Sequence, residues 1–171
     1  MTSEILISFA KPAELADAQR FYDDHGYRGD PIKVRDTVLL ACRRGELVGI
    51  VRLCQEDGFL CLRGMRVHPD FRRLGLGTRM LEHLETVMAN QPCYCLPYIY
   101  LAHFYGQVGF ISIDPVQLPP LLERRANDYI QRDILVSAMY RPAGQRIHSR
   151  NGTGSVQGPT EQTGCGYGLE H

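Results

Sequence analysis

One segment near the middle of the chain, residues 59–90, constrains the fold most, because it joins an apolar run to an amphipathic run through a glycine-containing loop. Residues 59–67 predict a β-strand, and residues 77–90 predict a helix whose apolar side chains recur at the spacing of one helix face. The loop between them contains two adjacent arginines and then two glycines separated by one residue. This order of elements predicts a binding site at the helix N-terminus.

The loop has the parts of a diphosphate-binding site. Gly75 and Gly77 allow the backbone to turn tightly and to bring its N–H groups close to a ligand. The helix N-terminus adds unpaired N–H donors and the positive end of the helix dipole. Arg72 and Arg73 can add charge-assisted hydrogen bonds. The alternative interpretation is an ordinary glycine-containing loop that enters a helix.

Two common phosphate-binding loops do not fit this spacing. The dinucleotide fingerprint G-x-G-x-x-G requires a third glycine, and Met80 stands at that position. A P-loop ends in Gly-Lys-Ser/Thr, whereas this chain has Gly77-Thr78-Arg79. The segment therefore predicts a phosphate loop of another kind.

Size and charge exclude several classes of protein. With 171 residues the chain is long enough for one domain with a real core, and its 19 basic and 19 acidic residues cancel. We therefore expect no nucleic-acid or membrane partner, and no apolar run is long enough to span a bilayer. Glu4 stands where a signal peptide would carry positive charge, so a cytoplasmic protein is expected.

The cysteines indicate core positions, not metal or redox chemistry. Cys42, Cys54 and Cys61 fall inside apolar strand patterns, where cysteine behaves as a small hydrophobe. Cys93 and Cys95 share one strand face and form neither a C-x-x-C pair nor, without a second cluster, a zinc site. No metal is expected.

The remaining elements predict an α+β fold around one mixed, mostly antiparallel sheet. The predicted strands cover residues 5–9, 37–43, 47–55, 93–100, 109–113 and 133–140, and the predicted helices cover residues 12–25, 102–107 and 118–130. From Arg141 onward Gly, Ser, Thr, Gln and Pro dominate. We therefore expect one domain at residues 1–140 and a low-complexity, disordered tail at residues 141–171.

Arg72, Gly75 and Gly77 fill the three positions of motif A, R/Q-x-x-G-x-G/A, of the GNAT superfamily (Gcn5-related N-acetyltransferases), which the chain resembles. The segment at residues 102–110 resembles the F-Y-x-x-x-G-F signature of the same family. Together with the order of elements, the resemblance covers residues 4–140. It implies a three-layer α/β/α arrangement, with a mostly antiparallel mixed sheet and flanking helices.

The resemblance implies acetyl-CoA as cosubstrate. The cofactor-binding residues that it implies are Met65, Val67, Arg72, Arg73, Leu74, Gly75, Leu76, Gly77 and Thr78. The loop backbone and the arginines would hold the diphosphate, and the backbone of Met65 and Val67 would pair with the pantetheine arm like an added strand. Gly64 within the preceding strand indicates either a bulge that splays two strands or plain close packing.

The resemblance also implies that Tyr105 is the general acid that protonates the departing thiolate. The alternative is a packed tyrosine with a hydrogen-bonded hydroxyl. Relatives carry an asparagine seven residues earlier, where this chain has Tyr98, so that contact to the pantetheine arm is in doubt.

No residue is assigned as the general base. The strand at residues 59–67 contains no carboxylate, which leaves Glu56, His68, His103 or water-mediated deprotonation as alternatives. Arg63 and Arg66 are costly in a central strand unless they are paired. They either pair with acidic neighbours, or one of them faces the acceptor and binds a carboxylate.

The sequence predicts an N-acetyltransferase that moves acetyl from acetyl-CoA to a primary amine of a small molecule or peptide by direct attack in a ternary complex. One alternative is a non-catalytic acyl-CoA-binding sensor, motivated by the missing carboxylate base. Another is a nucleotide- or phosphate-binding α/β protein. The acceptor, the length of the acyl group and the formation of a homodimer are left open.

Overall fold

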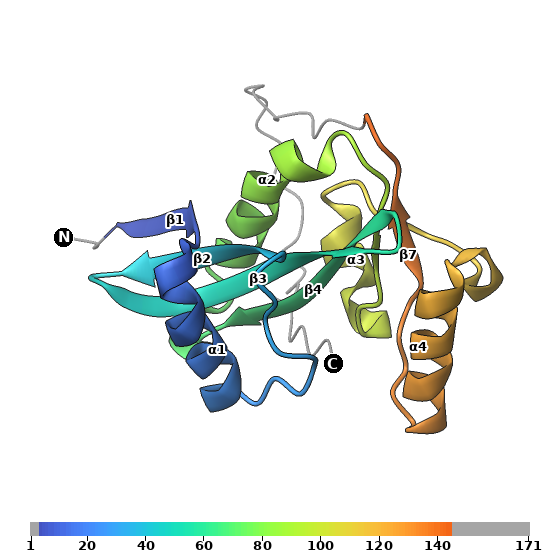
Figure 1. The fold of residues 1–171 in the computed structure, drawn as a ribbon, viewed down its shortest axis with the longest axis horizontal. Coiled ribbons are helices and arrows are strands. Elements are labelled where there is room, and N and C mark those ends of the chain that lie inside the picture. The colour runs from blue at the N-terminus through green and yellow to red at the C-terminus, as the bar shows by residue number, and fades with distance from the viewer. Residues whose placement is uncertain (1–3, 145–171) are drawn as a thin grey trace, which may run out of the picture.

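A computed structural model describes residues 4–144, which form one seven-stranded mixed sheet with helices on both faces (Figure 1). The strands are β1 (Ile5–Phe9), β2 (Thr37–Arg43), β3 (Glu46–Glu56), β4 (Phe59–Val67), β5 (Cys93–Cys95), β6 (Ile111–Ser112) and β7 (Met139–Arg141). The helices are α1 (Leu15–Asp24), α2 (Leu76–Met88), α3 (Ala102–Gly106) and α4 (Pro120–Gln131). Short 3₁₀ turns occupy Pro12–Glu14, Pro69–Phe71, Ile99–Leu101 and Pro115–Gln117.

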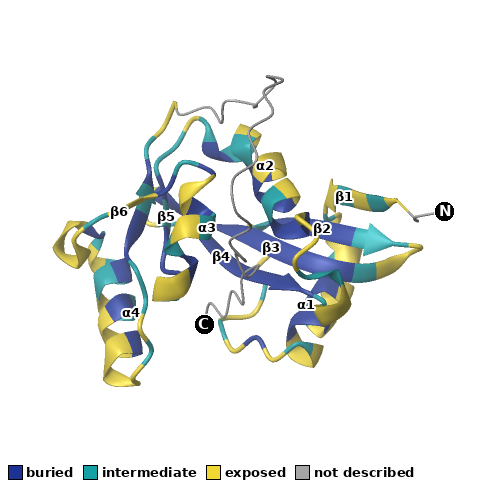
Figure 2. Cartoon of the chain, turned by 180° about the vertical axis from the view of Figure 1, so that it is seen from behind, coloured by how far each residue is buried: buried dark blue, intermediate teal, exposed yellow. Residues whose placement is uncertain are grey.

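The strand order is β1-β2-β3-β4-β5-β7-β6, and the pair β4–β5 is parallel whereas the pairs on either side of it are antiparallel. Both views place α2 on one face of the sheet and α1 and α4 on the other (Figures 1 and 2). The α2 face carries the largest apolar core, whereas α1 and α4 each cover a smaller one. These findings confirm the predicted α+β fold and its three layers.

At Gly64 of the central strand β4, the alternation of side chains between the two faces of the sheet shifts by one residue. Leu62 and Met65 both pack into the core beneath α2, although strict alternation would place them on opposite faces. The register explains this, because Arg52 pairs with Arg63 and Ile50 with Arg66, so two residues of β4 face one residue of β3. Gly64 has φ +65°, which a glycine adopts readily. The predicted bulge is therefore confirmed.

Tyr22 of α1 holds the bulge in place. Its hydroxyl donates a 2.8 Å hydrogen bond to the carbonyl of Gly64, and its side chain is fully buried. A Cβ on Gly64 would lie 2.4 Å from Tyr22 Oη. The close-packing interpretation of Gly64 is thus also confirmed, since the same glycine serves both purposes.

Beyond the bulge, β4 and β5 separate. In the described residues their ladder joins Leu60 to Cys93 and Cys61 to Tyr94, and β5 ends at Cys95. The prediction of a strand over residues 93–100 was therefore too long. Pro97 cannot donate to a ladder, and the following chain turns into the 3₁₀ segment Ile99–Leu101. The last part of β4 is left with a ladder to β3 on one side.

Other predicted boundaries shift in the C-terminal half. The strand predicted at residues 133–140 is shortened to β7, because Asp133 has a left-handed φ of +58° and Val136 makes a single bridge to Tyr98. Arg141, where the predicted tail begins, lies in β7 and is fully buried. Its guanidinium donates to the carbonyl of Val108 at 2.9 Å. Residues 145–171 lie outside the described residues, so the disordered tail stays a prediction.

The cysteines occupy core positions, as predicted. Cys54, Cys61, Cys93 and Cys95 are buried, and Cys42 is half-buried. Burial raises the pKa of the Cys54 thiol to about 11, so this thiol stays protonated at neutral pH. In residues 4–144 no helix is long and apolar enough to cross a membrane. A cytoplasmic location stays a prediction.

Replacing Gly64 by alanine should destabilise the fold far more than the same change at Gly58. Both glycines have positive φ, but a Cβ on Gly58 meets nothing within 4 Å whereas one on Gly64 meets the buried Tyr22 hydroxyl. We expect a loss of about 1 kcal/mol for Gly58→Ala and about 3 kcal/mol for Gly64→Ala. Urea unfolding measures both, and equal losses would contradict the proposed role of the bulge contact.

Candidate cofactor site and the opposite sheet face

The loop between β4 and α2 has a fixed backbone shape. After the 3₁₀ turn Pro69–Phe71, Arg73 and Gly75 both adopt left-handed conformations, with φ of +62° and +74°. Gly75 is the N-cap of α2 and has no side chain to cap the helix. The first N–H groups of an α-helix have no partner within the helix, so this end is suited to an anion.

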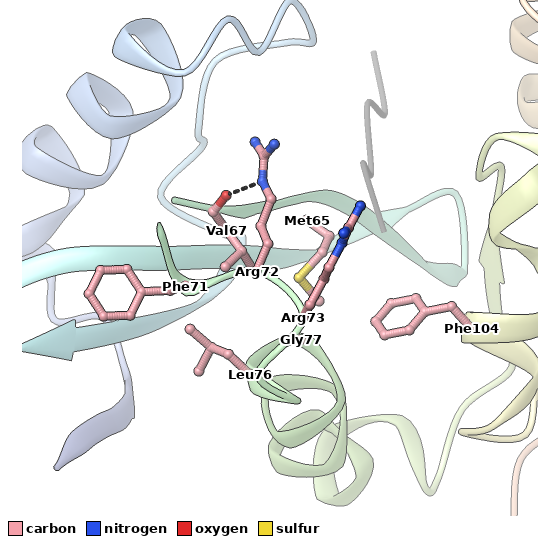
Figure 3. Close-up of a pocket in the computed structure, with 8 residues that line it drawn as sticks. All are labelled: Met65, Val67, Phe71, Arg72, Arg73, Leu76, Gly77 and Phe104. Carbon is pink, nitrogen blue, oxygen red and sulfur yellow. Dashed lines mark hydrogen bonds between the residues drawn. The ribbon is translucent and has the colours of Figure 1, made fainter. Parts of the chain in front are cut away.

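Arg72 ties the loop to the end of the strand. Its Nε donates a 2.9 Å hydrogen bond to the carbonyl of Val67, as Figure 3 shows. The carbonyl of Met65 accepts from the guanidinium of Arg66 at 3.3 Å. A carbonyl has two lone pairs, so both groups can still accept from a ligand amide.

A narrow pocket lies where the end of β4, the loop and the start of α2 meet α3. Its lining residues are Met65, Val67, Phe71, Arg72, Arg73, Leu76, Gly77 and Phe104 (Figure 3). Its cavity volume is about 10 Å³, which is room for about one water molecule. A larger ligand therefore has to displace a lining side chain.

The pocket brings together most of the residues predicted from the sequence to hold a cofactor. Met65, Val67, Arg72, Arg73, Leu76 and Gly77 line it, whereas Gly75 and Thr78 lie beside it in the loop and the first helical turn. Leu74 is exposed and lines a separate open cavity on the other side of the loop, with Arg43 and Arg79.

Phe71 and Phe104 also line the pocket and were missed. Phe104 lies within the F-Y-x-x-x-G-F segment, which was a usable signal, whereas nothing in the sequence singles out Phe71. The two glycines of the loop differ in function. A Cβ on Gly75 meets nothing within 4 Å, but one on Gly77 would lie 3.1 Å from Phe104 Cζ. Gly75 shapes the turn, and Gly77 lets the ring of Phe104 approach the helix.

Tyr105 lies on α3 next to Phe104 and is fully buried. Its ring meets the rings of Phe104 and Phe110 edge-on, with centroids 5.0 Å and 6.2 Å away. Phe104, and not Tyr105, is among the residues that line the pocket. The general-acid role of Tyr105 stays a prediction.

The candidates for the general base differ in their surroundings. The carboxylate of Glu56 lies 3.1 Å from Arg125 and 3.7 Å from Arg63, so two guanidinium groups already engage it. The ring of His68 accepts a hydrogen bond from the N–H of Asp70. His103 is exposed on α3. The geometry favours none of the three as base.

The opposite face of the sheet carries buried arginines beneath α1. Arg52, Arg63 and Arg66 are 1%, 6% and 4% exposed. Arg52 donates to the carboxylate of Asp36 at 3.0 Å and to the carbonyl of Pro31 at 3.0 Å. It therefore anchors the loop between α1 and β2 against the sheet.

Arg63 and Arg66 differ in what they contact. Arg63 forms a 3.0 Å ion pair with Asp30 and lies 3.7 Å from Glu56, which confirms the predicted acidic partners for this residue. The hydrogen bond from Arg63 lowers the pKa of Asp30 below its usual value. The guanidinium of Arg66 lies over the ring of Tyr27, 5.4 Å from its centroid.

These features define a class of protein. A mixed sheet splits beside a helix N-terminus, a loop with arginines and glycines shapes that N-terminus, and buried arginines lie on the other face. Such an arrangement is that of a protein that holds an anionic ligand at a helix N-terminus.

Comparison with protein families identifies the class. The model of the Acetyltransferase (GNAT) family matches residues 4–110, more than half of the chain. The chain belongs to this family of acetyltransferases. No curated protein sequence matches it.

Solved structures with the same fold share less than 20% sequence identity with this chain in the three examples that follow. A GNAT acetyltransferase from Streptococcus pneumoniae has a TM-score of 0.61 and 18% identity, over 82% of this chain and 100% of that chain. The ribosomal-protein-S18-alanine N-acetyltransferase from Escherichia coli has a TM-score of 0.58 and 18% identity, over 88% and 99%. N-acetylglutamate synthase from Neisseria gonorrhoeae, complexed with coenzyme A and N-acetyl-glutamate, has a TM-score of 0.57 and 17% identity, over 87% and 36%. This chain thus spans about a third of the synthase chain.

The contact between Gly77 and Phe104 should appear as an interaction energy in a double-mutant cycle. In a Phe104→Leu background, Gly77→Ala should stabilise the protein by about 0.5–1 kcal/mol, because alanine is the better helix former. In the wild type the clash with the ring cancels that gain. Urea unfolding of the wild type, the two single variants and the double variant should give an interaction free energy of about 0.5–1 kcal/mol between the two positions. Strict additivity would show that Gly77 is not required by Phe104.

Proposed function

We propose that the chain is an N-acetyltransferase that transfers acetyl from acetyl-CoA to a primary amine by direct attack in a ternary complex. The observation that carries this proposal is the pocket at the end of β4, where the strand leaves β5 and meets the loop at the N-terminus of α2. The family match to acetyltransferases supports it. So do two structural neighbours, a synthase complexed with coenzyme A and an alanine N-acetyltransferase.

The residues present fit the parts of acetyl-CoA. The backbone N–H groups of the loop, with Arg72 and Arg73, would hold the diphosphate by charge-assisted hydrogen bonds. The backbone of Met65 and Val67 would pair with the pantetheine amides along the open edge of β4. Acetyl-CoA supplies the activated acetyl group, and Phe104 is one of the side chains that line the path of the arm.

Tyr105 is proposed as the general acid. When the amine nitrogen attacks the thioester carbonyl, the C–S bond breaks and the thiolate takes a proton, which a phenol can supply. Tyr105 is fully buried on α3 beside Phe104, which lines the pocket. The amine proton leaves to water, because no side chain is assigned as base.

CoA should raise the melting temperature by about 5 °C or more at saturation, whereas ATP and NAD should leave it nearly unchanged. Gly75→Val should abolish the shift, because the turn that aims the loop requires the left-handed conformation. Gly45→Val is the matched control, since Gly45 also has positive φ and open space but lies in the remote β2–β3 turn. Stabilisation by ATP as strong as that by CoA would instead favour a nucleotide-binding protein.

Tyr105→Phe should lower kcat about 100-fold and leave the affinity for CoA unchanged, because only the hydroxyl is removed from a well-packed ring. Release of free thiol from acetyl-CoA across an amine panel measures the rate, and calorimetry measures the affinity. An unchanged kcat would remove Tyr105 from the mechanism. Tight CoA binding without turnover on any amine would favour a non-catalytic sensor.

A further inference from the structure

We propose that the amine acceptor carries a carboxylate, and that Arg63 binds this carboxylate in the place now occupied by the side chain of Asp30. This inference rests on the proposed acetyl transfer and names the class of acceptor. It starts from the three buried arginines on the α1 face, because each buried guanidinium requires compensating contacts.

The guanidinium of Arg52 binds groups of the protein itself. It donates to the carboxylate of Asp36, to the carbonyls of Pro31 and Asp30, and to the hydroxyl of Tyr27. These contacts fix the backbone of the loop between α1 and β2. The backbone of Asp30 is therefore held independently of its side chain.

Arg63 has a different kind of partner. The side chain of Arg63 is 7% exposed, whereas the side chain of Asp30, which it binds at 3.0 Å, is 57% exposed. An exposed side chain on a loop can leave the pair without disturbing the core, and a ligand carboxylate can take its place with the same geometry. The second acidic neighbour, Glu56, lies closer to Arg125 than to Arg63, at 3.1 Å against 3.7 Å. Asp30 thus marks where a carboxylate docks on Arg63.

The bulge places this arginine across the sheet from the cofactor pocket. Met65 and Val67 line the pocket on the α2 face, while Arg63 and Arg66 contact residues of the opposite face. In the described residues the β4–β5 ladder ends at Cys61, so no ladder pairs join the two strands beside Arg63. In the proposed arrangement, an acceptor held by its carboxylate on the α1 face reaches the thioester with its amine between these two strands.

The surroundings strengthen the attraction for an anion. Arg66 lies two residues beyond the bulge and adds a second buried positive charge, held against the ring of Tyr27. Figure 2 shows α1 and α4 on the same side of the sheet, and the acidic neighbours of Arg63 connect it to the α1–β2 loop through Asp30 and to α4 through the pair of Glu56 with Arg125. Hydrogen bonds between charged groups are strong in such a partly desolvated place.

The test compares three forms of each acceptor: free amino acids, the same amino acids as carboxamides, and the amines that lack the carboxyl group. Thiol release from acetyl-CoA is measured for wild type, Arg63→Gln, Asp30→Asn and Arg125→Gln. Wild type should prefer the free acids by at least about tenfold in kcat/KM. Arg63→Gln should raise KM for the acids by at least about tenfold and erase the preference.

Asp30→Asn should change KM in the opposite direction. It removes the competing carboxylate, so KM for the acids should fall about threefold while KM for the carboxamides stays constant. Arg125→Gln is the matched control, because it disturbs Glu56 but does not contact Asp30. If Arg63 only stabilised the network around Glu56, both arginine variants would raise KM alike, and the inference would be wrong.

The failures of this inference and of the proposed function are distinguishable. Equal turnover of acids, carboxamides and simple amines would retain the acetyltransferase and overturn the carboxylate site. If no amine is turned over, calorimetric titration of the CoA complex with the free amino acids decides the matter. Binding that is lost in Arg63→Gln supports the site, and the absence of binding overturns it. Melting curves of all variants confirm that they fold.

Discussion

The bulge at Gly64 is the constraint on which the proposed cofactor site and the proposed acceptor site both depend. Strict alternation along β4 would place Arg63 on the same face as Met65 and Val67. Because two residues of β4 face one residue of β3, the phase changes, and both Arg63 and Arg66 come to lie on the face opposite the pocket. One extra residue therefore separates an apolar, ligand-lining face from a charged face within the same strand.

Charge in the middle of the sheet is tolerated because the segment between α1 and β2 folds back over it. Arg52 and Arg63 lie in neighbouring strands, where their like charges would repel. The segment supplies the carboxylates of Asp30 and Asp36 to these guanidinium groups. The segment and the arginines thus stabilise each other, so the charged face and its cover form one structural unit.

The sequence predicted those features whose causes lie close together in the chain. The bounds of β4 matched, since an apolar run ended by Asp57-Gly58 on one side and Pro69 on the other is a local signal. For the same reason, six of the eight residues that line the pocket were already singled out from the sequence. The partner of Arg63 lies 33 residues away, and the approach of Phe104 to Gly77 requires the crossover from α2 to α3, so neither could be read from local patterns.

The errors at the strand ends have a physical cause that links them to the site. The strand predicted at residues 93–100 ends before Pro97, at Cys95. Within the segment predicted as a strand at residues 133–140, the part before β7 makes only isolated contacts, such as the bridge between Val136 and Tyr98. A longer β5 would have continued the parallel ladder along the last part of β4, whereas residues 133–140 lie on the far side of β5 and do not face β4. The residues after Cys95 favour a strand by composition but do not join the ladder, so β4 keeps an unpaired edge beside the pocket. The proposed pairing of β4 with the pantetheine arm depends on this unpaired edge, because a ligand can add to a strand only where no other strand already pairs with it.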